Sequence, residues 1–311
     1  MSATTAAAPA RRDRAVARPG LSDRTLALLL IAPAAVLLLV LTAYPSALAI
    51  INSFFHVDFA TGARSSPGGL NYIETLTDPE IRAATWRTIV WSVGNLVIQL
   101  VAGVACAMVL NAKLRGQTLA RGLMLFPYMV PAVVATLIFR YLLNDVTGLV
   151  NHLLQVAHLI DQPVNFLGDP DTVLLSLVAV NSWKYTPFIT LIVLARLQTV
   201  PHSLYDAARL DGAGGWALFR SVTLPWIAPA LLAAALLRTI WTAYDFDLPY
   251  LLAFGGPVNA STTLAIEIRK VAFDQQDIGL ASALSVCFAI LLIAAAVPYI
   301  RSFRRSEHWA R

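Results

Sequence analysis

The sequence predicts an all-α, polytopic membrane protein with six transmembrane helices. Of its 311 residues, 58% are hydrophobic and only 13% are charged, and the mean hydropathy is +0.66. Soluble domains carry about 25% charged residues, so a soluble enzyme, a secreted disulfide scaffold and a disordered chain are all excluded. The second observation is a series of apolar runs, each near the roughly 20 residues that a helix needs to cross the hydrocarbon core.

These runs fix the expected order of the spans. We place them at Thr25–Ile51, Thr85–Leu110, Gly122–Leu143, Thr172–Leu197, Trp226–Leu252 and Ile278–Ile300. Several contain proline, which membrane helices tolerate where neighbouring helices satisfy the carbonyl groups that it frees. We therefore expect kinked helices around a central cavity.

The basic residues predict the orientation of the spans. Most of the 23 Lys and Arg residues fall in the two terminal tails and in the second and fourth loops. The positive-inside rule then places both termini in the cytoplasm, which agrees with an even number of spans. A cleavable signal peptide is the alternative for the first span, but its loss would invert this charge balance.

The same pattern divides the chain into three parts. Residues 1–23, rich in Ala, Pro and Arg, are predicted to be a disordered basic cytoplasmic tail. Residues 24–303 form the transmembrane domain, and residues 304–311 form a second cytoplasmic tail. No metal site or disulfide framework is expected, because Cys106 and Cys287 both lie in apolar runs.

The fourth loop, Pro201–Pro225, is more structured than a linker. It reads PHSLYDAARLDGAGGWALFRSVTLP, with helix-forming residues over Tyr205–Leu210 and a glycine-rich turn at Gly212–Gly215. We expect a second short helix over Trp216–Val222, ended by Thr223–Pro225, where the fifth span starts. The loop is thus predicted to be a helix–turn–helix on the cytoplasmic side, and we call residues 201–225 the knuckle.

The knuckle resembles the EAA loop of the inner-membrane permeases of ABC importers, in which E-A-A is followed by D-G-A and then by L-P. The residues that carry this match, with the tyrosine before them, are Tyr205, Asp206, Ala207, Ala208, Asp211, Gly212, Ala213, Leu224 and Pro225. Asp206 stands where the family usually has Glu, which keeps the charge and shortens its reach. The resemblance implies that the knuckle is a coupling helix that docks in a groove of an ATPase subunit.

Motifs along the rest of the chain resemble the carbohydrate permeases of the maltose type. They are, in order, Gly69–Tyr72, Gly148–Asn151, Trp183–Phe188, Phe246–Asp247 and Gly255–Pro257. This resemblance implies a multi-pass permease of the bacterial cytoplasmic (inner) membrane that imports a sugar or oligosaccharide. It also implies a transport subunit rather than an enzyme.

The chain itself lacks the means to hydrolyse ATP. A Walker A loop needs Gly directly before Lys, and the three lysines, Lys113, Lys184 and Lys270, follow Ala, Trp and Arg. No cofactor is therefore expected on this chain, and ATP and Mg belong to a partner ATPase.

The implied partners are an ATP-binding subunit dimer, an extracytoplasmic solute-binding protein and a second permease subunit in the lipid bilayer. A related but distinct permease, giving a heterodimer, is favoured, and a homodimer stays open. No nucleic-acid partner is expected, because the positive charge follows loop position.

Polar side chains inside the fourth and fifth spans are the candidates for a substrate site, since ionisable groups in a bilayer are costly. Helical spacing puts each of two sets on one face: Asn181, Lys184, Tyr185 and Phe188, and then Arg238, Thr242 and Asp245. Donors, a carboxylate acceptor and aromatic rings, including nearby Trp241 and Tyr244, suit a sugar.

Three alternatives stay open at this point. In the first, Lys184 or Arg238 pairs with Asp245 only to hold helices together. In the second, the two cations bind an anionic polyol phosphate, such as glycerol phosphate, in place of a sugar. In the third, the chain is an ion-coupled secondary transporter, although it shows no inverted repeat and only Asp245 and Asp247 as an ion relay.

Overall fold

The computed structural model describes residues 22–65, 68–112 and 115–306. Most of the predicted N-terminal tail and the last five residues lie outside this part of the chain. The described residues belong to two compact units that divide between Leu48 and Ala49.

The first unit is a single apolar helix. α1 (Asp23–Leu38) begins where the Ser22 side chain accepts a hydrogen bond from the Thr25 amide at 3.2 Å. It continues through a π-helical turn, η1 (Leu39–Ala43), into α2 (Tyr44–Asn52), which leads into the second unit. The first predicted span is confirmed as one run, Arg24–Asn52, whose apolar side chains are exposed and available to lipid.

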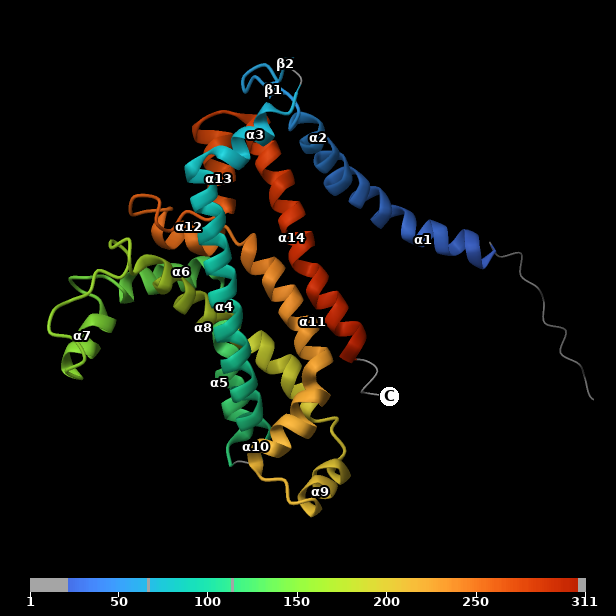
Figure 1. Cartoon of the computed structure of the whole chain (residues 1–311), viewed down its shortest axis with the longest axis vertical. Coiled ribbons are helices and arrows are strands. Elements are labelled where there is room, and N and C mark those ends of the chain that lie inside the picture. Colours follow the sequence, from blue (N-terminus) through green and yellow to red (C-terminus); the bar gives the residue numbers. More distant parts are fainter. Residues whose placement is uncertain (1–21, 66–67, 113–114, 307–311) are drawn as a thin grey trace, which may run out of the picture. The chain divides into compact units, whose positions relative to one another are not determined.

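The second unit is almost entirely helical (Figure 1). Its helices are α3 (Leu70–Thr77), α4 (Pro79–Asn111), α5 (Gln117–Met129), α6 (Ala132–Leu142), α7 (Leu149–Val156), α8 (Val173–Leu197), α9 (His202–Leu210), α10 (Gly215–Leu218), α11 (Leu224–Ala243), α12 (Asp247–Ala253), α13 (Leu264–Arg269) and α14 (Ile278–Ser306). Two further π-helical turns are η2 (Phe219–Thr223) and η3 (Lys270–Asp274). The strands β1 (His56–Val57) and β2 (Arg64–Ser65) form one short antiparallel pair, with His56 opposite Ser65.

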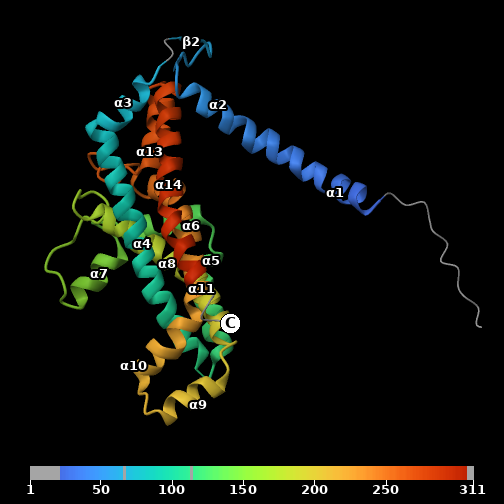
Figure 2. The same cartoon turned by 45° about the vertical axis from the view of Figure 1, so that its right-hand side comes forward.

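The predicted all-α polytopic fold is confirmed. In the described part of the chain, five helices are long and apolar enough to cross a membrane, and a bent pair brings the number to six when it is counted as one span. α4, α8, α11 and α14 run alongside one another through the second unit (Figures 1 and 2). α9 and α10 lie together at the end of this unit opposite β1 and β2.

The third predicted span is broken at one of its prolines. Instead of one helix over Gly122–Leu143, α5 and α6 meet at 93°. Pro131 causes the break, because it has no amide hydrogen and it forces the preceding residue out of the helical region. Val130 accordingly has an extended ψ of 128°.

The fifth span also differs from its prediction. α11 ends at Ala243 instead of continuing to Leu252, and it is the C-terminal part of one helical run over Gly215–Ala243. A second helix, α12, starts at Asp247, and the Asp245 side chain accepts a hydrogen bond from the Leu248 amide at 3.4 Å. The long helix therefore ends before α12 begins, with Asp245 in the short segment between them.

Other helix boundaries lie closer to their predicted positions. α4 starts at Pro79, earlier than predicted, because the Asp78 side chain accepts hydrogen bonds from the amides of Glu80 and Ile81 at 2.7 and 2.9 Å. α7, a short helix after the third span, ends at Val156.

The core of the second unit lies where α4 packs along α8. Ala107 on α4 and Ile189 and Val193 on α8 are fully buried in one cluster. Gly103 permits the close approach, because a Cβ atom there would lie 2.6 Å from Ile189 Cγ2. Gly94, on the same helix, has room for a Cβ atom at 3.5 Å from Val178.

We expect Gly103→Ala to destabilise the protein by about 1–3 kcal/mol, because the overpacked methyl group pushes α4 away from α8. Gly94→Ala is the matched control, and it should be neutral or slightly stabilising because Ala favours a helix over Gly. Thermal unfolding of the two purified variants in detergent makes the comparison. Equal unfolding temperatures would show that the two helices are not in close contact at Gly103.

Candidate functional site

A buried polar network joins three spans around Arg238 of α11, which is 3% exposed. Its Nε donates to Gln99 Oε1 of α4 at 2.8 Å, and its Nη2 donates to Asn181 Oδ1 of α8 at 3.2 Å. The same nitrogen donates to Thr242 Oγ1 at 2.8 Å. We call Asn95, Gln99, Asn181, Ser182, Arg238 and Thr242 the Arg238 network.

Asn181 links the cation of this network to a carboxylate. Its Oδ1 also accepts from Gln99 Nε2 at 3.1 Å, and its Nδ2 donates to Asp245 Oδ2 at 3.0 Å. None of the ion pairs between described residues joins Asp245 to Lys184 or Arg238. The amide therefore stands between the two charges in place of a direct pair.

Lys184 is held by a different part of the molecule. It is 3% exposed, and its Nζ donates to the carbonyl oxygen of Val130 at the end of α5. The last carbonyl groups of a helix lack partners within the helix and carry partial negative charge. The ammonium group thus caps α5 at the break in the third span and fastens it to α8, while its Nζ lies 5.2 Å from the centre of the Tyr185 ring.

Aromatic rings border the Arg238 network. The Tyr185 ring lies 4.2 Å from the Arg238 guanidinium carbon. Tyr128 contacts Tyr185 and Phe188 with ring centres 6.1 and 6.3 Å apart, and Phe188 contacts Trp241 at 5.3 Å. We call Tyr128, Tyr185, Phe188 and Trp241 the aromatic cluster.

The cluster is more accessible than the network. Tyr128 is 40% and Trp241 36% exposed, and Tyr185, Phe188 and Asp245 are half-buried. Asn181, Arg238 and Thr242, in contrast, are nearly inaccessible and have protein partners. A ligand that approached this region would meet ring surface and one carboxylate.

Sequence analysis missed several members of this region. Asn95 and Gln99 lie four residues apart on α4, and the structure places both in the Arg238 network. Ser182 donates to Asn95 Oδ1 at 3.1 Å, and Trp91 Nε1 donates to the Thr242 carbonyl at 2.8 Å. The spacing of Trp91, Asn95 and Gln99 by four residues was the available signal. Nothing comparable marked Tyr128, because a kink was expected in the proline-containing spans but a bend of 93° was not.

The knuckle is a helix followed by a glycine turn, as predicted, but its second arm was predicted wrongly. Gly212 has a φ of +81°, the left-handed conformation that side chains rarely adopt. α10 then continues through the π-helical turn η2 into α11, so Thr223–Pro225 does not end a separate helix. The second arm is therefore an extension of the fifth span.

Contacts inside the knuckle connect the residues of the EAA-like motif. The Tyr205 and Thr223 hydroxyl oxygens are 3.1 Å apart, and Arg209 Nη1 lies 3.4 Å from Asp206 Oδ1. The amides of Asp211 and Ala213 donate to the carbonyl oxygens of Ala207 and Ala208 at 3.1 and 2.9 Å, and Leu224 and Pro225 form the first turn of α11.

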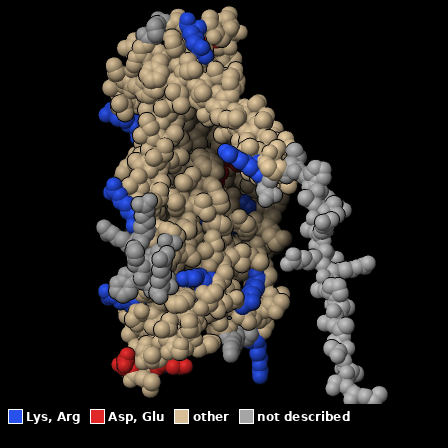
Figure 3. All heavy atoms as spheres, turned by 90° about the vertical axis from the view of Figure 1, so that its right-hand side faces the viewer, with Lys and Arg blue, Asp and Glu red and all other residues tan. Residues whose placement is uncertain are grey.

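The knuckle surface combines apolar and acidic groups. Leu210 is 89% and Trp216 74% exposed, and the Trp216 ring stacks on that of Phe219 with centres 5.4 Å apart. Figure 3 shows acidic atoms at the lower end of the second unit, the end at which α9 lies in Figure 1. Such large exposed apolar side chains with a polar surround are typical of protein interfaces.

Comparison with known proteins places this architecture in a family. Residues 99–308 match the family described as binding-protein-dependent transport system inner membrane components. The sulfoquinovosyl glycerol transport system permease protein SmoG of Agrobacterium fabrum is 34% identical over 288 residues, which cover 92% of this chain and 93% of that protein. The trehalose/maltose transport system permease protein MalF of Thermococcus litoralis is 34% identical over 76% of this chain and 79% of its own.

A solved structure shares the fold. A chain of a bacterial ABC transporter involved in the import of the acidic polysaccharide alginate superposes with a TM-score of 0.76 at 20% identity, over 91% of this chain and 96% of that one. The matched family consists of inner-membrane components, and the described helices supply several candidate spans. The chain therefore belongs to the inner-membrane components of binding-protein-dependent transport systems, and it is a multi-pass permease of the ABC importer type.

Proposed function

We propose that this permease carries a sugar or oligosaccharide across the bacterial cytoplasmic membrane, powered by ATP that a separate subunit hydrolyses. The aromatic cluster is the observation that carries the proposal. Aromatic rings stack on the apolar faces of sugar rings, and a carboxylate accepts hydrogen bonds from hydroxyl groups. Relatives named as permeases for sulfoquinovosyl glycerol and for trehalose and maltose support the same substrate class.

The predicted substrate residues take different roles in this proposal. Tyr185, Phe188 and Asp245 contact the sugar, together with Tyr128 and Trp241. Asn181, Arg238 and Thr242 act behind them, because they are buried and hold Tyr185 and Asp245 in place. Lys184 positions α5, and with it Tyr128.

A sugar is favoured over a polyol phosphate. The two cations that favoured an anionic substrate, Lys184 and Arg238, are each 3% exposed. Lys184 Nζ donates to Val130, and Nε and Nη2 of Arg238 donate to Gln99, Asn181 and Thr242. A phosphate group would have to displace these contacts, and each displaced group would lose its hydrogen bond in a buried site.

We further propose the arrangement of the complex. The knuckle faces the cytoplasm, as the positive-inside rule predicts, and docks on one subunit of an ATP-binding dimer that holds ATP and Mg. The exposed Leu210 and Trp216 flank the EAA-like residues and supply an apolar contact surface. A second, related permease completes a heterodimer, and an extracytoplasmic solute-binding protein delivers the sugar.

The test is uptake of a panel of labelled sugars by the complete importer in proteoliposomes, normalised to assembled complex. We expect Phe188→Ala and Trp241→Ala each to raise the KM for the transported sugar about 3- to 10-fold, because each variant loses one stacking contact with the sugar. Trp86→Ala is the matched control, because Trp86 is 65% exposed on α4 and outside the cluster. An unchanged KM in both cluster variants would move the sugar site elsewhere.

A further inference from the structure

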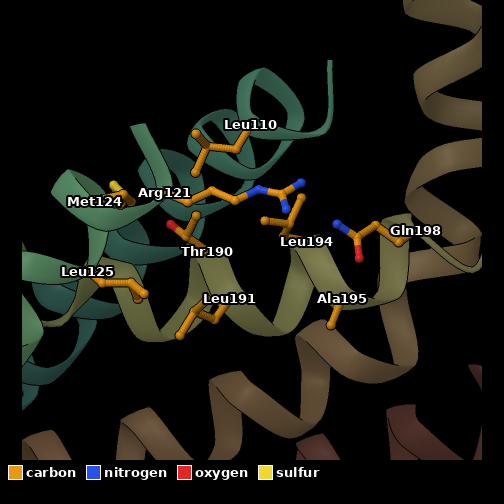
Figure 4. Close-up of a pocket in the computed structure, with 9 residues that line it drawn as sticks. All are labelled: Leu110, Arg121, Met124, Leu125, Thr190, Leu191, Leu194, Ala195 and Gln198. Atoms are coloured by element: carbon orange, nitrogen blue, oxygen red, sulfur yellow. The ribbon is translucent and has the colours of Figure 1, made fainter. Parts of the chain in front are cut away.

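One cavity has a lining that shares no residue with the aromatic cluster. It has a volume of about 250 Å³ and is formed by α5, the C-terminal half of α8 and the end of α4 (Figure 4). Its walls are largely apolar and include Leu110, Met124, Leu125 and Leu194. Ala195, also part of the lining, is exposed, so the cavity is accessible from outside the helix bundle.

One cation enters this apolar space. In Figure 4 the Arg121 side chain runs above α8, with its guanidinium group between Leu110 and Leu194 and directed toward Gln198. Its Nε is buried and has no hydrogen-bond partner among the described residues. None of the ion pairs in the described part of the chain involves Arg121 either. Buried polar groups in native proteins nearly always have a partner, so an acceptor is missing here.

The cavity lies where several membrane-spanning helices begin or end. Leu110 is near the end of α4, Arg121 is near the start of α5, and Gln198 is the C-cap residue of α8. These helix ends meet on the side of the second unit that carries α9 and α10 (Figure 1). Transmembrane helices end where lipid headgroups begin, so headgroup phosphates lie near these helix ends.

We propose that this cavity binds an anionic phospholipid. The headgroup phosphate accepts hydrogen bonds from the Arg121 guanidinium, and an acyl chain covers the leucines of α5 and α8. Basic pockets between transmembrane helices on the cytoplasmic side bind such headgroups. A free soluble anion would satisfy Arg121 but would leave the apolar walls uncovered, whereas a phospholipid matches both.

This lipid fastens α5 to α8. Those two helices also supply Tyr128 and Phe188 to the aromatic cluster, so the lipid supports the geometry of the transport pathway from a distance. The proposal does not depend on the identity of the transported substrate.

The experiment uses the complete importer in nanodiscs of phosphatidylcholine with a rising fraction of phosphatidylglycerol. Retained phosphatidylglycerol is counted by mass spectrometry after exchange into detergent. We expect Arg121→Gln to lower the retained amount about fivefold, because that is the factor in affinity that one Arg near a headgroup contributes. Arg220→Gln is the control, since Arg220 is an exposed cation of η2 outside the cavity. Ala195→Trp, which fills the cavity and keeps Arg121, should lower retention as well.

Three results would overturn the proposal. The first is equal retention of phosphatidylglycerol by the wild type and both cavity variants. The second is a thermal stabilisation by inorganic phosphate as large as that by phosphatidylglycerol, which would assign the site to a soluble anion. The third is efficient crosslinking of Ala195→Cys to the second permease, which would show that a protein surface covers the cavity.

Discussion

Arg238→Met is expected to remove most of the folded protein from the membrane. The substitution takes away the donor that serves Gln99 Oε1, Asn181 Oδ1 and Thr242 Oγ1. Gln99 Oε1 and Thr242 Oγ1 are nearly inaccessible to water and find no replacement partner, whereas Asn181 Oδ1 keeps its hydrogen bond from Gln99 Nε2. Each acceptor left unpaired costs about 1–3 kcal/mol, and the half-buried Asp245 also loses the nearest cation of the network.

The sum approaches the whole stability of a typical domain, so the amount of assembled importer should fall before transport is affected. Membrane abundance by quantitative immunoblotting and uptake per assembled complex are the two measurements. Arg82→Met is the control, because Arg82 is an exposed cation near the start of α4. Normal abundance of Arg238→Met with reduced uptake per complex would instead make Arg238 a direct ligand of the substrate.

Gly212→Val is expected to uncouple ATP hydrolysis from transport. A β-branched residue at a φ of +81° is strained by about 1–3 kcal/mol, so the turn between α9 and α10 adopts another conformation. No heavy atom lies within 4 Å of a Cβ at Gly212, so the effect comes from the backbone alone. We expect uptake per complex to fall about tenfold, since a displaced α9 costs the docking contact at least about 1.4 kcal/mol.

Gly214→Val is the matched control for this turn. Gly214 has a φ of −76° and equally open surroundings, so the same side chain is tolerated there. Asp206→Ala tests the docking contact itself, because the Asp206–Arg209 pair is largely exposed and adds little stability. The measurements are uptake and ATPase activity of assembled complexes. Normal uptake in both Gly212→Val and Asp206→Ala would rule out coupling through the knuckle.

Most of the architecture could be predicted from the sequence. Hydropathy and helix length are local properties, so the apolar runs predicted the spans. Five of the six are present as long apolar helices, and the third is the bent pair of α5 and α6. Helical spacing predicted that Asn181 and Tyr185 share one face, and Arg238 and Thr242 another. The structure brings these faces together through the hydrogen bond between Arg238 and Asn181. The glycine turn at Gly212 followed from its conformational freedom.

Only the tertiary structure decided how the polar groups pair. Arg238 and Gln99 are 139 residues apart in sequence, and no local pattern states which helix faces meet. Lys184 was expected near the substrate, yet it caps α5, because the break at Pro131 leaves the Val130 carbonyl free beside it. The same bend placed Tyr128 in the aromatic cluster and left Arg121 beside a cavity. Burial and hydrogen bonding depend on the relative placement of whole helices, which the 3.6-residue repeat of one helix does not contain.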